Sequence, residues 1–243
     1  MKSFPIEFSE LVNKRRYTQA RSSARLLRGD KLRVIWFPLL MDHPLVNASI
    51  HLLNRNLGAF LKPWDVPICP STITAMKVNF SELLPKTVRN QTVILNNSRS
   101  PAYAAARRIG LTRMLGSESL HKFAEEISGF SLDHDPGFQV IQYRTGDYIG
   151  PHNDHHPEDA NLREGYVDLQ ITLTNEAVER QLFMYEDNGY LNQTVNVGIR
   201  SGVSISILPF WHQVSPLEAK PGMEQRAQRW VLLVSWEIIR RRL

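Results

Sequence analysis

The stretch GVSISILPFWHQVSPL, Gly202 to Leu217, indicates the fold of this 243-residue chain. Its first half, GVSISILP, is a short apolar run of β-type residues, which predicts a β-strand. Pro209 ends this run, two aromatic residues follow, and His212 then precedes the turn at Pro216. A strand that delivers a histidine at its end predicts a site near the mouth of a β-barrel, where residues distant in sequence converge.

The rest of the chain after Gly129 also consists of short β-type runs separated by turns. These runs are FQVIQYR (138–144), YVDLQITLT (166–174), RQLFMYE (180–186), QTVNVGI (193–199) and RWVLLVSWEI (229–238). Many short strands at fairly regular spacing predict a sandwich or barrel of antiparallel strands.

The first 130 residues have a mixed pattern. KLRVIWFPLL (31–40) and TVILNN (92–97) are strand candidates, and NASIHLLNRNLGAFL (47–61) is a helix candidate. SESLHKFAEEISGF (117–130) predicts a helix with Ser117 as its cap, one apolar stripe and Gly129 as its terminator. We expect it to pack on the sheet. Without a linker or repeat, we expect one domain over 1–243, with 1–130 as a support region and 131–243 as the barrel core.

Composition restricts the class of protein. At 42% hydrophobic and 22% charged residues the chain is typical of soluble globular proteins, and no apolar run approaches the roughly 20 residues of a membrane span. Cys69 is the only cysteine, so an internal disulfide and a multi-cysteine zinc site are excluded.

We find no targeting signal at the N-terminus and expect a cytoplasmic protein. The net charge of +5 arises largely from clusters at Lys14–Arg28 and Arg240–Arg242, which we interpret as solvated faces, so a nucleic-acid partner is not expected.

The segment GDYIGPHNDHHPED (146–159) concentrates histidines and carboxylates in a turn-rich loop. His152 and Asp154 are two positions apart, so in extended chain both side chains can face one ion. A third imidazole would complete the arrangement of two histidines and one carboxylate that suits non-haem Fe(II). The candidates for this third ligand are His155, His156, His212, His43, His51, His121 and His134. His212 has the best context, because it ends a strand.

At this point the chain resembles the 2-oxoglutarate- and Fe(II)-dependent oxygenases, in particular their compact prolyl-hydroxylase-like branch. The matching features are Tyr143 and Gly146 in YRTGDYIGPHND, the H-N-D of His152 to Asp154, the segment containing His212, and a basic residue that opens RWVLLVSWEI. They stand in this order over roughly residues 138–238. The combination is much more specific than any one feature.

The resemblance implies a double-stranded β-helix, a jelly-roll barrel with packed helices, which agrees with the mainly β fold with helices that the pattern predicts. It implies that His152, Asp154 and His212 bind Fe(II), and that 2-oxoglutarate and O2 are cosubstrates. An arginine would hold the far carboxylate of 2-oxoglutarate. We favour Arg229 over Arg226 for this role. Both lie further from His212 than is usual in the family, because PLEAKPGMEQ (216–225) intervenes.

Further roles follow from the same resemblance. Tyr143 would line the cosubstrate pocket. Ser235, on the same strand face as Arg229, would add a hydroxyl to the carboxylate site. His155 and His156 would be exposed or contact substrate at the mouth. The chain lacks the Gly-Gly that many members have before RQLFMYE, so the substrate-facing strand is expected to differ in shape.

The activity implied is hydroxylation of an unactivated C–H bond, because halogenating relatives replace the carboxylate that Asp154 retains here. The substrate would be a small molecule, such as an amino acid or a biosynthetic intermediate, or a protein side chain, with a slight preference for the first. The alternatives are a non-catalytic metal-binding jelly roll and, with less support, an oxygenase directed at nucleic acid. The oligomeric state is not specified by the sequence.

Overall fold

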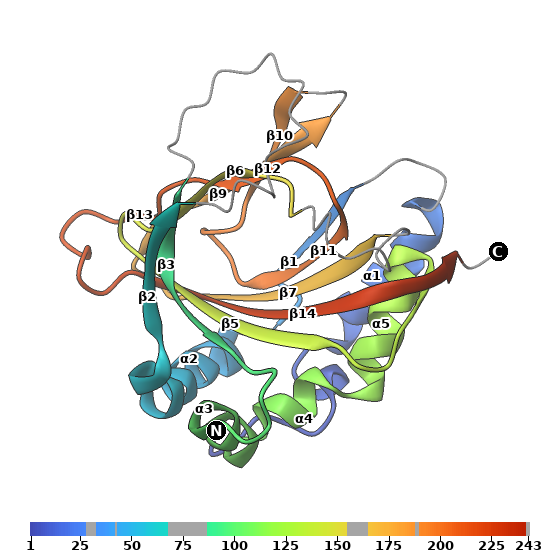
Figure 1. Ribbon diagram of the computed structural model, residues 1–243, viewed down its shortest axis with the longest axis horizontal. Coiled ribbons are helices and arrows are strands. Elements are labelled where there is room, and N and C mark those ends of the chain that lie inside the picture. The colour runs from blue at the N-terminus through green and yellow to red at the C-terminus, as the bar shows by residue number, and fades with distance from the viewer. Residues whose placement is uncertain (28–32, 42, 68–86, 155–164, 188–189, 242–243) are drawn as a thin grey trace.

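The chain folds around one large antiparallel sheet that curls into a nearly closed barrel (Figure 1). The computed structural model describes residues 1–27, 33–41, 43–67, 87–154, 165–187 and 190–241. The sheet has 12 strands, and most of them follow one another in the order β1-β11-β7-β14-β5-β3-β6-β12-β9-β10. Strand β2 pairs with β3, strand β4 pairs with β14, and a separate pair is formed by β8 and β13.

The strands are β1 (Val34–Pro38), β2 (Lys62–Pro67), β3 (Thr87–Ile94), β4 (Phe130–Leu132), β5 (Gly137–Arg144), β6 (Tyr148–His152), β7 (Tyr166–Thr174), β8 (Val178–Arg180), β9 (Leu182–Asp187), β10 (Tyr190–Asn196), β11 (Gly202–Leu208), β12 (His212–Val214), β13 (Glu218–Ala219) and β14 (Gln228–Arg241). The helices are η1 (Phe8–Glu10), α1 (Lys14–Leu27), α2 (His43–Leu57), η2 (Gly58–Phe60), α3 (Pro101–Arg108), α4 (Leu111–Leu115) and α5 (Glu118–Ser128).

The strands predicted from short β-type runs between turns are confirmed. The runs at 138–144, 166–174, 180–186, 193–199 and 229–238 correspond to β5, β7, β9, β10 and β14, and the opening stretch contains β11 and β12. The first 130 residues contribute more than support, because β1, β2 and β3 all belong to the large sheet. The histidine segment was predicted as a loop, but His152 is the last residue of strand β6.

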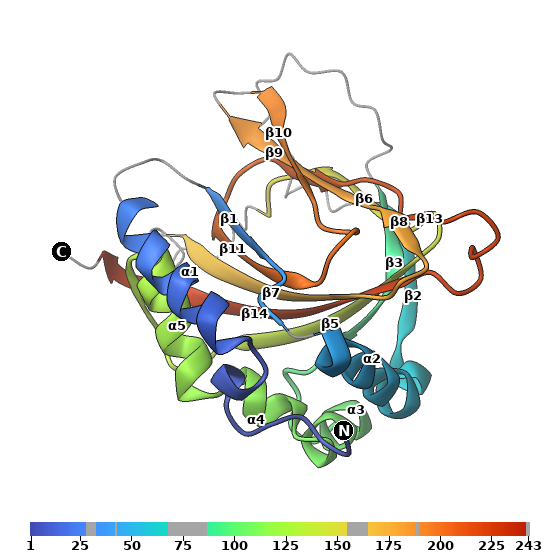
Figure 2. The same cartoon turned by 180° about the vertical axis from the view of Figure 1, so that it is seen from behind.

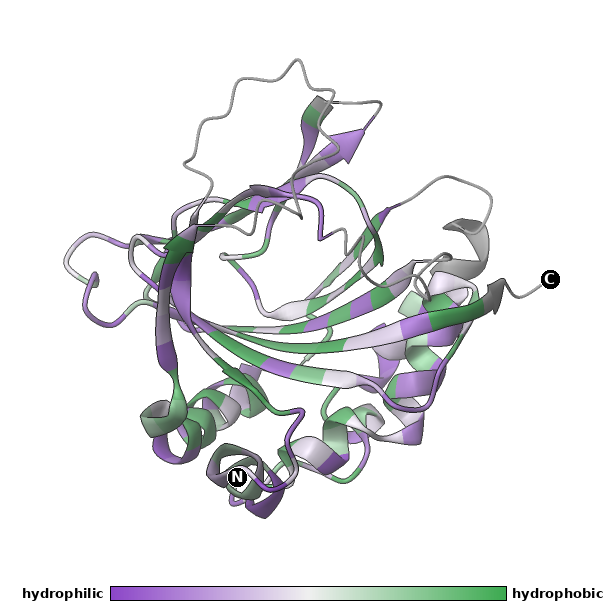
Figure 3. Ribbon diagram, viewed as in Figure 1, coloured by the Kyte–Doolittle hydropathy of each residue, from purple (hydrophilic) through white to green (hydrophobic). Residues whose placement is uncertain are grey.

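Period-two alternation gives the strands of the barrel two different faces. On β14, Trp230, Leu232, Val234 and Trp236 belong to the core cluster shared with the helices, whereas Arg229, Val231 and Leu233 line the barrel interior. Figure 3 shows the resulting bands of alternating hydropathy along β7 and β14. The helices cover the outer face of these strands, and the side of the barrel formed by β6, β12 and β9 lies opposite (Figure 2).

Helix α5 forms as predicted but is capped differently. Gly129 ends it at φ 79° and donates its N–H to the Glu125 carbonyl, as expected for a glycine terminator. Ser117 stands at the N-cap, yet its hydroxyl accepts a hydrogen bond from the Phe8 N–H rather than from its own helix. The Glu7 carboxylate accepts from the Ser119 N–H instead, so the N-terminal segment satisfies a free donor of this helix.

Among the described helices, none combines the length and apolar character needed to cross a membrane.

Gly165, which precedes β7, is a specific constraint on the barrel wall. It adopts φ +84°, and a Cβ there would collide with the Leu208 carbonyl oxygen on the neighbouring strand. We expect Gly165→Ala to destabilise the fold by about 3 kcal/mol, because the left-handed conformation and the collision both oppose the methyl group. The melting temperature should fall by roughly 6–12 °C in a thermal unfolding scan.

Gly222→Ala is the matched control for this prediction, because Gly222 adopts φ +75° and nothing lies within 4 Å of the point that its Cβ would occupy. Only the backbone cost of about 1 kcal/mol should remain. Equal losses in the two variants would show that the contact with Leu208 does not matter.

Candidate metal centre

A single rung of the sheet brings the two predicted histidine ligands together. Strands β6 and β12 are antiparallel neighbours, and His152 lies directly opposite His212. Opposed side chains on adjacent strands have Cβ atoms about 5 Å apart. The two rings accordingly lie with centroids 4.2 Å apart, although the residues are distant in sequence.

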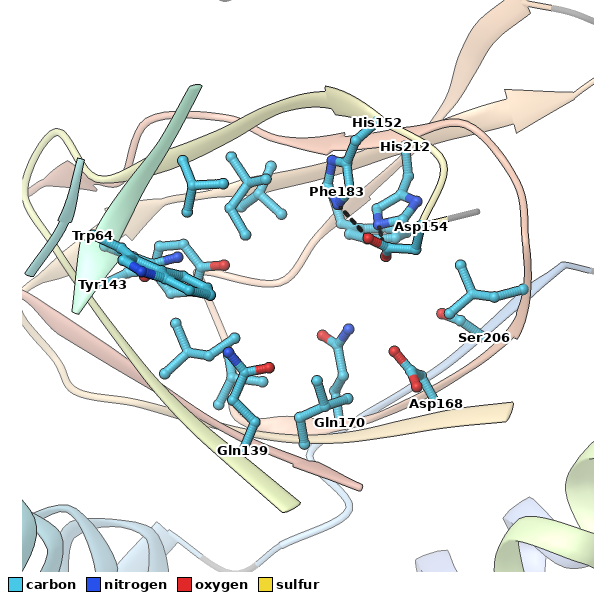
Figure 4. Close-up of a pocket in the computed structure, with 18 of the residues that line it drawn as sticks. Trp64, Gln139, Tyr143, His152, Asp154, Asp168, Gln170, Phe183, Ser206 and His212 are labelled. Carbon is cyan, nitrogen blue, oxygen red and sulfur yellow. Dashed lines mark ion pairs between the residues drawn. The ribbon is translucent and has the colours of Figure 1, made fainter. Parts of the chain in front are cut away.

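Asp154 completes the group from a position two residues after the end of β6. Its φ of 51° is a left-handed conformation that aspartate tolerates better than most residues. The Tyr166 hydroxyl donates to the Asp154 carbonyl at 2.9 Å and holds Asp154 against β7. The carboxylate lies between the rings, with Oδ1 3.4 Å from His152 Nε2 and Oδ2 3.3 Å from His212 Nε2 (Figure 4).

The hydrogen bonds behind the rings orient both histidines as ligands. His152 Nδ1 lies 2.8 Å from the Gly150 carbonyl, and His212 Nδ1 lies 2.9 Å from the Phe210 carbonyl. Because a carbonyl only accepts, each Nδ1 carries the hydrogen, and each Nε2 presents its lone pair to the space between the rings. The three candidate ligand atoms lie within 4.8 Å of one another. This donor set fits one divalent metal ion.

His152, Asp154 and His212 shift one another's pKa values. Burial opposes the charge of Asp154, but the neighbouring His152 and His212 hold its pKa well below the usual range. Burial likewise opposes the charge of His152, but Asp154 outweighs it and raises the pKa. The pKa of His212 is lowered by burial and by the nearby His152. An ionised carboxylate beside two buried imidazoles is the state that a cation requires.

The other histidines weighed as ligands lie elsewhere or outside the described ranges. His155 and His156 fall in the latter group. His121 and His134 stack on each other with centroids 4.6 Å apart beside α5, and His43 and His51 belong to α2. Over the part of the chain that the structure describes, His152, Asp154 and His212 are the only such group with ligand atoms this close. With two nitrogen ligands and one oxygen ligand, they leave positions open on an octahedral ion such as Fe(II).

Arg229 lies in the same cavity and is buried, with 2% of its surface exposed. One terminal nitrogen donates to Gln181 Oε1 at 3.0 Å and the other to Thr172 Oγ1 at 3.2 Å. The guanidinium lies over the Tyr143 ring, 5.1 Å from its centroid. Its Nε has no partner, and no described carboxylate pairs with it. Burial lowers its pKa to about 10, so the group remains a cation.

Gln181 shows that this arrangement is fixed. Its amide nitrogen donates to the Asp147 and Ser215 carbonyls, at 3.2 and 3.0 Å, so its oxygen must face Arg229. The partners of Arg229 are therefore neutral. A buried cation with only neutral partners is costly unless an anion joins it. The free Nε and the uncompensated charge fit the carboxylate of a ligand.

The other residues predicted to bind 2-oxoglutarate lie in three different places: Tyr143 beneath Arg229, Arg226 at the surface and Ser235 beside Asp168. Tyr143 is buried beneath Arg229 and lines the cavity, and burial raises its pKa to about 12, so its hydroxyl is neutral. Arg226 is exposed and pairs with Glu176 at 2.9 Å, away from the cavity-lining residues. Ser235 shares the strand face of Arg229, but its hydroxyl donates to Asp168 at 2.6 Å. Six residues of strand separate it from Arg229, about 20 Å.

The cavity has a volume of about 400 Å³ and passes between the triad and β14. Figure 4 shows Tyr143 at one end, Asp168 and Ser206 at the other, and the triad on the wall above. Asp168 was not predicted as a site residue. The alternation of YVDLQITLT could have revealed it, because Asp168, Gln170 and Thr172 all point to one side of β7 and that side is the barrel interior.

Comparison with known proteins depends on structure alone, because in sequence the chain matches no family model and no curated protein. An oxidoreductase of the 2OG-Fe(II) oxygenase family from Burkholderia pseudomallei superposes with a TM-score of 0.56 at 12% identity, covering 93% of this chain and 92% of that one. A Trichoplax adhaerens prolyl hydroxylase, solved with a hypoxia-inducible-factor peptide, gives 0.56 at 11% identity and covers 92% and 91%.

The α-ketoglutarate-dependent epimerase SnoN from nogalamycin biosynthesis gives 0.52 at 15% identity, covering 91% of this chain and 84% of that one. The chain has the fold of the 2-oxoglutarate/Fe(II) oxygenases. The double-stranded β-helix expected from the sequence is thus confirmed, and the oxygenase fold extends over the first 130 residues as well as over the predicted core.

Metal binding should depend on His212. His212→Ala removes one of three ligands, so we expect the affinity for Mn(II), a redox-stable substitute for Fe(II), to fall about 100-fold or more in calorimetric titration. His51→Ala changes an exposed histidine of α2 and should leave the affinity unchanged. Unaltered Mn(II) binding in His212→Ala would exclude this site.

Asp168 should impose a pH dependence on stability. Burial raises its pKa to about 7 from 3.8, the value expected in the unfolded chain. Because the folded state holds the proton more tightly, stability should fall as the pH rises from about 4 to about 7. Asp168→Asn removes this loss, so the variant should gain more over the wild type at pH 8 than at pH 5 in thermal scans of the metal-free protein.

Asp65→Asn is the control for that measurement, since Asp65 is an exposed carboxylate that pairs with Arg89 at the surface. Its effect should be small and similar at both pH values. An equal gain of Asp168→Asn over the wild type at pH 5 and pH 8 would contradict the prediction.

Proposed function

We propose that this chain is an Fe(II)- and 2-oxoglutarate-dependent dioxygenase that hydroxylates an unactivated C–H bond of a small molecule, such as an amino acid or a biosynthetic intermediate, or of a protein side chain. The observation that carries the proposal is the buried, anion-free Arg229 in the same cavity as His152, Asp154 and His212. A metal site alone would not require such a cation.

In this proposal the three ligands hold Fe(II), and Arg229 receives the far carboxylate of 2-oxoglutarate through its planar fork. Gln181 and Thr172 hold the guanidinium in position, and the Tyr143 ring lies beneath it. The bound metal would supply oxygen activation, in which one atom of O2 enters succinate as 2-oxoglutarate loses carbon dioxide and the other enters the substrate as a hydroxyl group.

Other residues of the chain shape this reaction space. The Phe183 and Phe210 rings lie 5.4 and 5.1 Å from the His212 ring and form an apolar wall beside the metal position. Such a wall excludes water from the reacting atoms. Asp154 occupies the ligand position that a halide would need, which favours hydroxylation over halogenation.

The alternatives differ from this proposal in what they require. A non-catalytic metal-binding jelly roll has no need for an unpaired buried arginine next to the metal. An oxygenase acting on nucleic acid would be expected to bind DNA or RNA in a strongly salt-dependent manner.

The single cysteine and the ferrous ion both suit a reducing cytoplasm. The solved structures with this fold include an enzyme seen with a peptide and an epimerase of small-molecule biosynthesis, so both substrate classes remain in the proposal.

The decisive experiment is an anaerobic titration of the protein with Fe(II) and 2-oxoglutarate, followed by visible absorption. A keto acid chelated to Fe(II) gives a weak charge-transfer band, which we expect in the wild type and not in Asp154→Ala. Iron bound without this band would favour the non-catalytic metal-binding jelly roll.

The same titration tests the assignment of Arg229. Arg229→Gln removes the cation that holds the far carboxylate, so the concentration of 2-oxoglutarate that gives half of the band should rise about 100-fold. Arg226→Gln removes an exposed arginine that pairs with Glu176 and should change it less than twofold. The reverse order would transfer the anchor to Arg226.

A further inference from the structure

A row of three polar side chains, Ser206, Asp168 and Ser235, lies at the end of the cavity opposite Arg229. Strands β11, β7 and β14 are neighbours, and their register places Ser206 opposite Asp168 and Asp168 opposite Ser235. Asp168 and Ser206 are buried, with 6% and 3% of their surfaces exposed, and both line the cavity. Figure 4 shows both side chains directed into it, below the triad.

The hydrogen bonding of this row is incomplete. The Ser235 hydroxyl donates to Asp168 Oδ1, and this is the one hydrogen bond of the Asp168 side chain to a described residue. Ser206 makes no side-chain hydrogen bond within the described ranges, and no described lysine, arginine or histidine pairs with Asp168. A carboxylate and a hydroxyl, each more than nine-tenths buried, therefore face the cavity with unused bonding capacity.

The charge around this row is negative. A second hollow of about 380 Å³ adjoins the cavity and shares Gln139, Asp154, Asp168 and Leu233 with it. Asp133, Asp135 and Glu237 also line this hollow, and none of its described lining residues is basic. Carboxylates in a recess reinforce one another and attract cations.

The cosubstrate cannot account for this end of the cavity. Thr172, which holds Arg229, lies four residues from Asp168 along β7, about 13 Å of strand. A dicarboxylate held at Arg229 would be repelled by Asp168 and the carboxylates beside it. The space next to the triad on this side is therefore available to a second molecule of opposite charge.

We propose that Asp168, with Ser206 beside it, receives a positively charged nitrogen of the substrate, so that the molecule oxidised carries an ammonium or guanidinium group. This inference depends on the proposed function, since it names the substrate class of the same site. The charge can belong to a free amine or to a basic side chain of a peptide, and both present the same group to Asp168.

Matched cationic and neutral probes test this directly in protein loaded with Zn(II) and 2-oxoglutarate, which binds but does not turn over. The pairs are n-butylammonium with 1-butanol and n-butylguanidinium with n-butylurea. The peptide arm compares N-acetyl-lysine methylamide with N-acetyl-norleucine methylamide. We expect at least one cation to bind about tenfold more tightly than its neutral partner in ligand-observed NMR titrations.

The preference should fall below about threefold in Asp168→Asn and persist in Glu118→Gln, which removes an exposed carboxylate on α5 that pairs with Lys122. Asp135 is an exposed carboxylate at the hollow, so Asp135→Asn should reduce the preference for the cation about twofold. This variant replaces Asp168→Asn in the test if Asp168→Asn does not fold. A preference confined to the peptide pair would identify a peptidyl substrate, and one confined to the small amines would identify a free amine.

Equal binding of cations and neutral partners by the wild type, or a preference that survives in Asp168→Asn, would overturn the inference. These results are separate from those that test the oxygenase. If the wild type prefers cations but gives no charge-transfer band with Fe(II) and 2-oxoglutarate, the proposed function is refuted. If it gives the band but shows no preference for cations, only the substrate class is refuted.

Discussion

The pairing of the three-residue strand β12 with both β6 and β9 is the interaction on which the site depends. It joins β6, which continues from β3 and the helix-covered half of the sheet, to the β9–β10 hairpin on the opposite side. The same rung that continues the sheet sets His152 opposite His212. The pairing that curls the sheet thus also sets the two histidines side by side, and both are held by the main-chain pairing of β6 and β12.

Alternation along the long strands separates stability from chemistry. On β7 and β14, one side chain in two packs against the helices, and the next faces the cavity. The outward set is apolar and fully buried, whereas the inward set includes Asp168, Thr172 and Arg229. The interior has a cation at one end and a carboxylate at the other, with the triad between them. Under the proposed function, this gradient would direct the dicarboxylate to Arg229 and a cationic substrate to Asp168.

The sequence predicted the parts of the fold that depend on long, regular patterns. Strands β5, β7, β11 and β14 have seven or more residues and are rich in aliphatic and aromatic residues, which is enough to recognise them. Strands β6 and β12 are shorter, β6 contains Pro151 and β12 lies between Pro209 and Pro216, so their pairing could not be read locally. The triad was accessible because the order of its residues along the chain resembles that of the 2-oxoglutarate- and Fe(II)-dependent oxygenases, although the rung that assembles it was not.

The polar residues of the cavity were harder to predict, because their contacts depend on the side of the sheet that they face. Ser235 was placed correctly on the face of Arg229, but neighbouring strand β7 gives it Asp168 as a partner. Gln181 is fully buried beside Arg229 at a point where the pattern suggested only a departure from a Gly-Gly motif. Cross-strand neighbours set these contacts, and a single strand does not contain them.

The position of Arg229 also bears on how this fold can vary in sequence. Tyr143 on one side and Thr174 on the other are its cross-strand neighbours, and the register continues over many rungs of β14. Between β12 and β14 the chain forms β13 and a turn outside the large sheet. Insertions there would lengthen the interval between His212 and Arg229 without moving either residue. A sequence pattern that fixed this interval would overlook chains whose cavities are arranged in the same way.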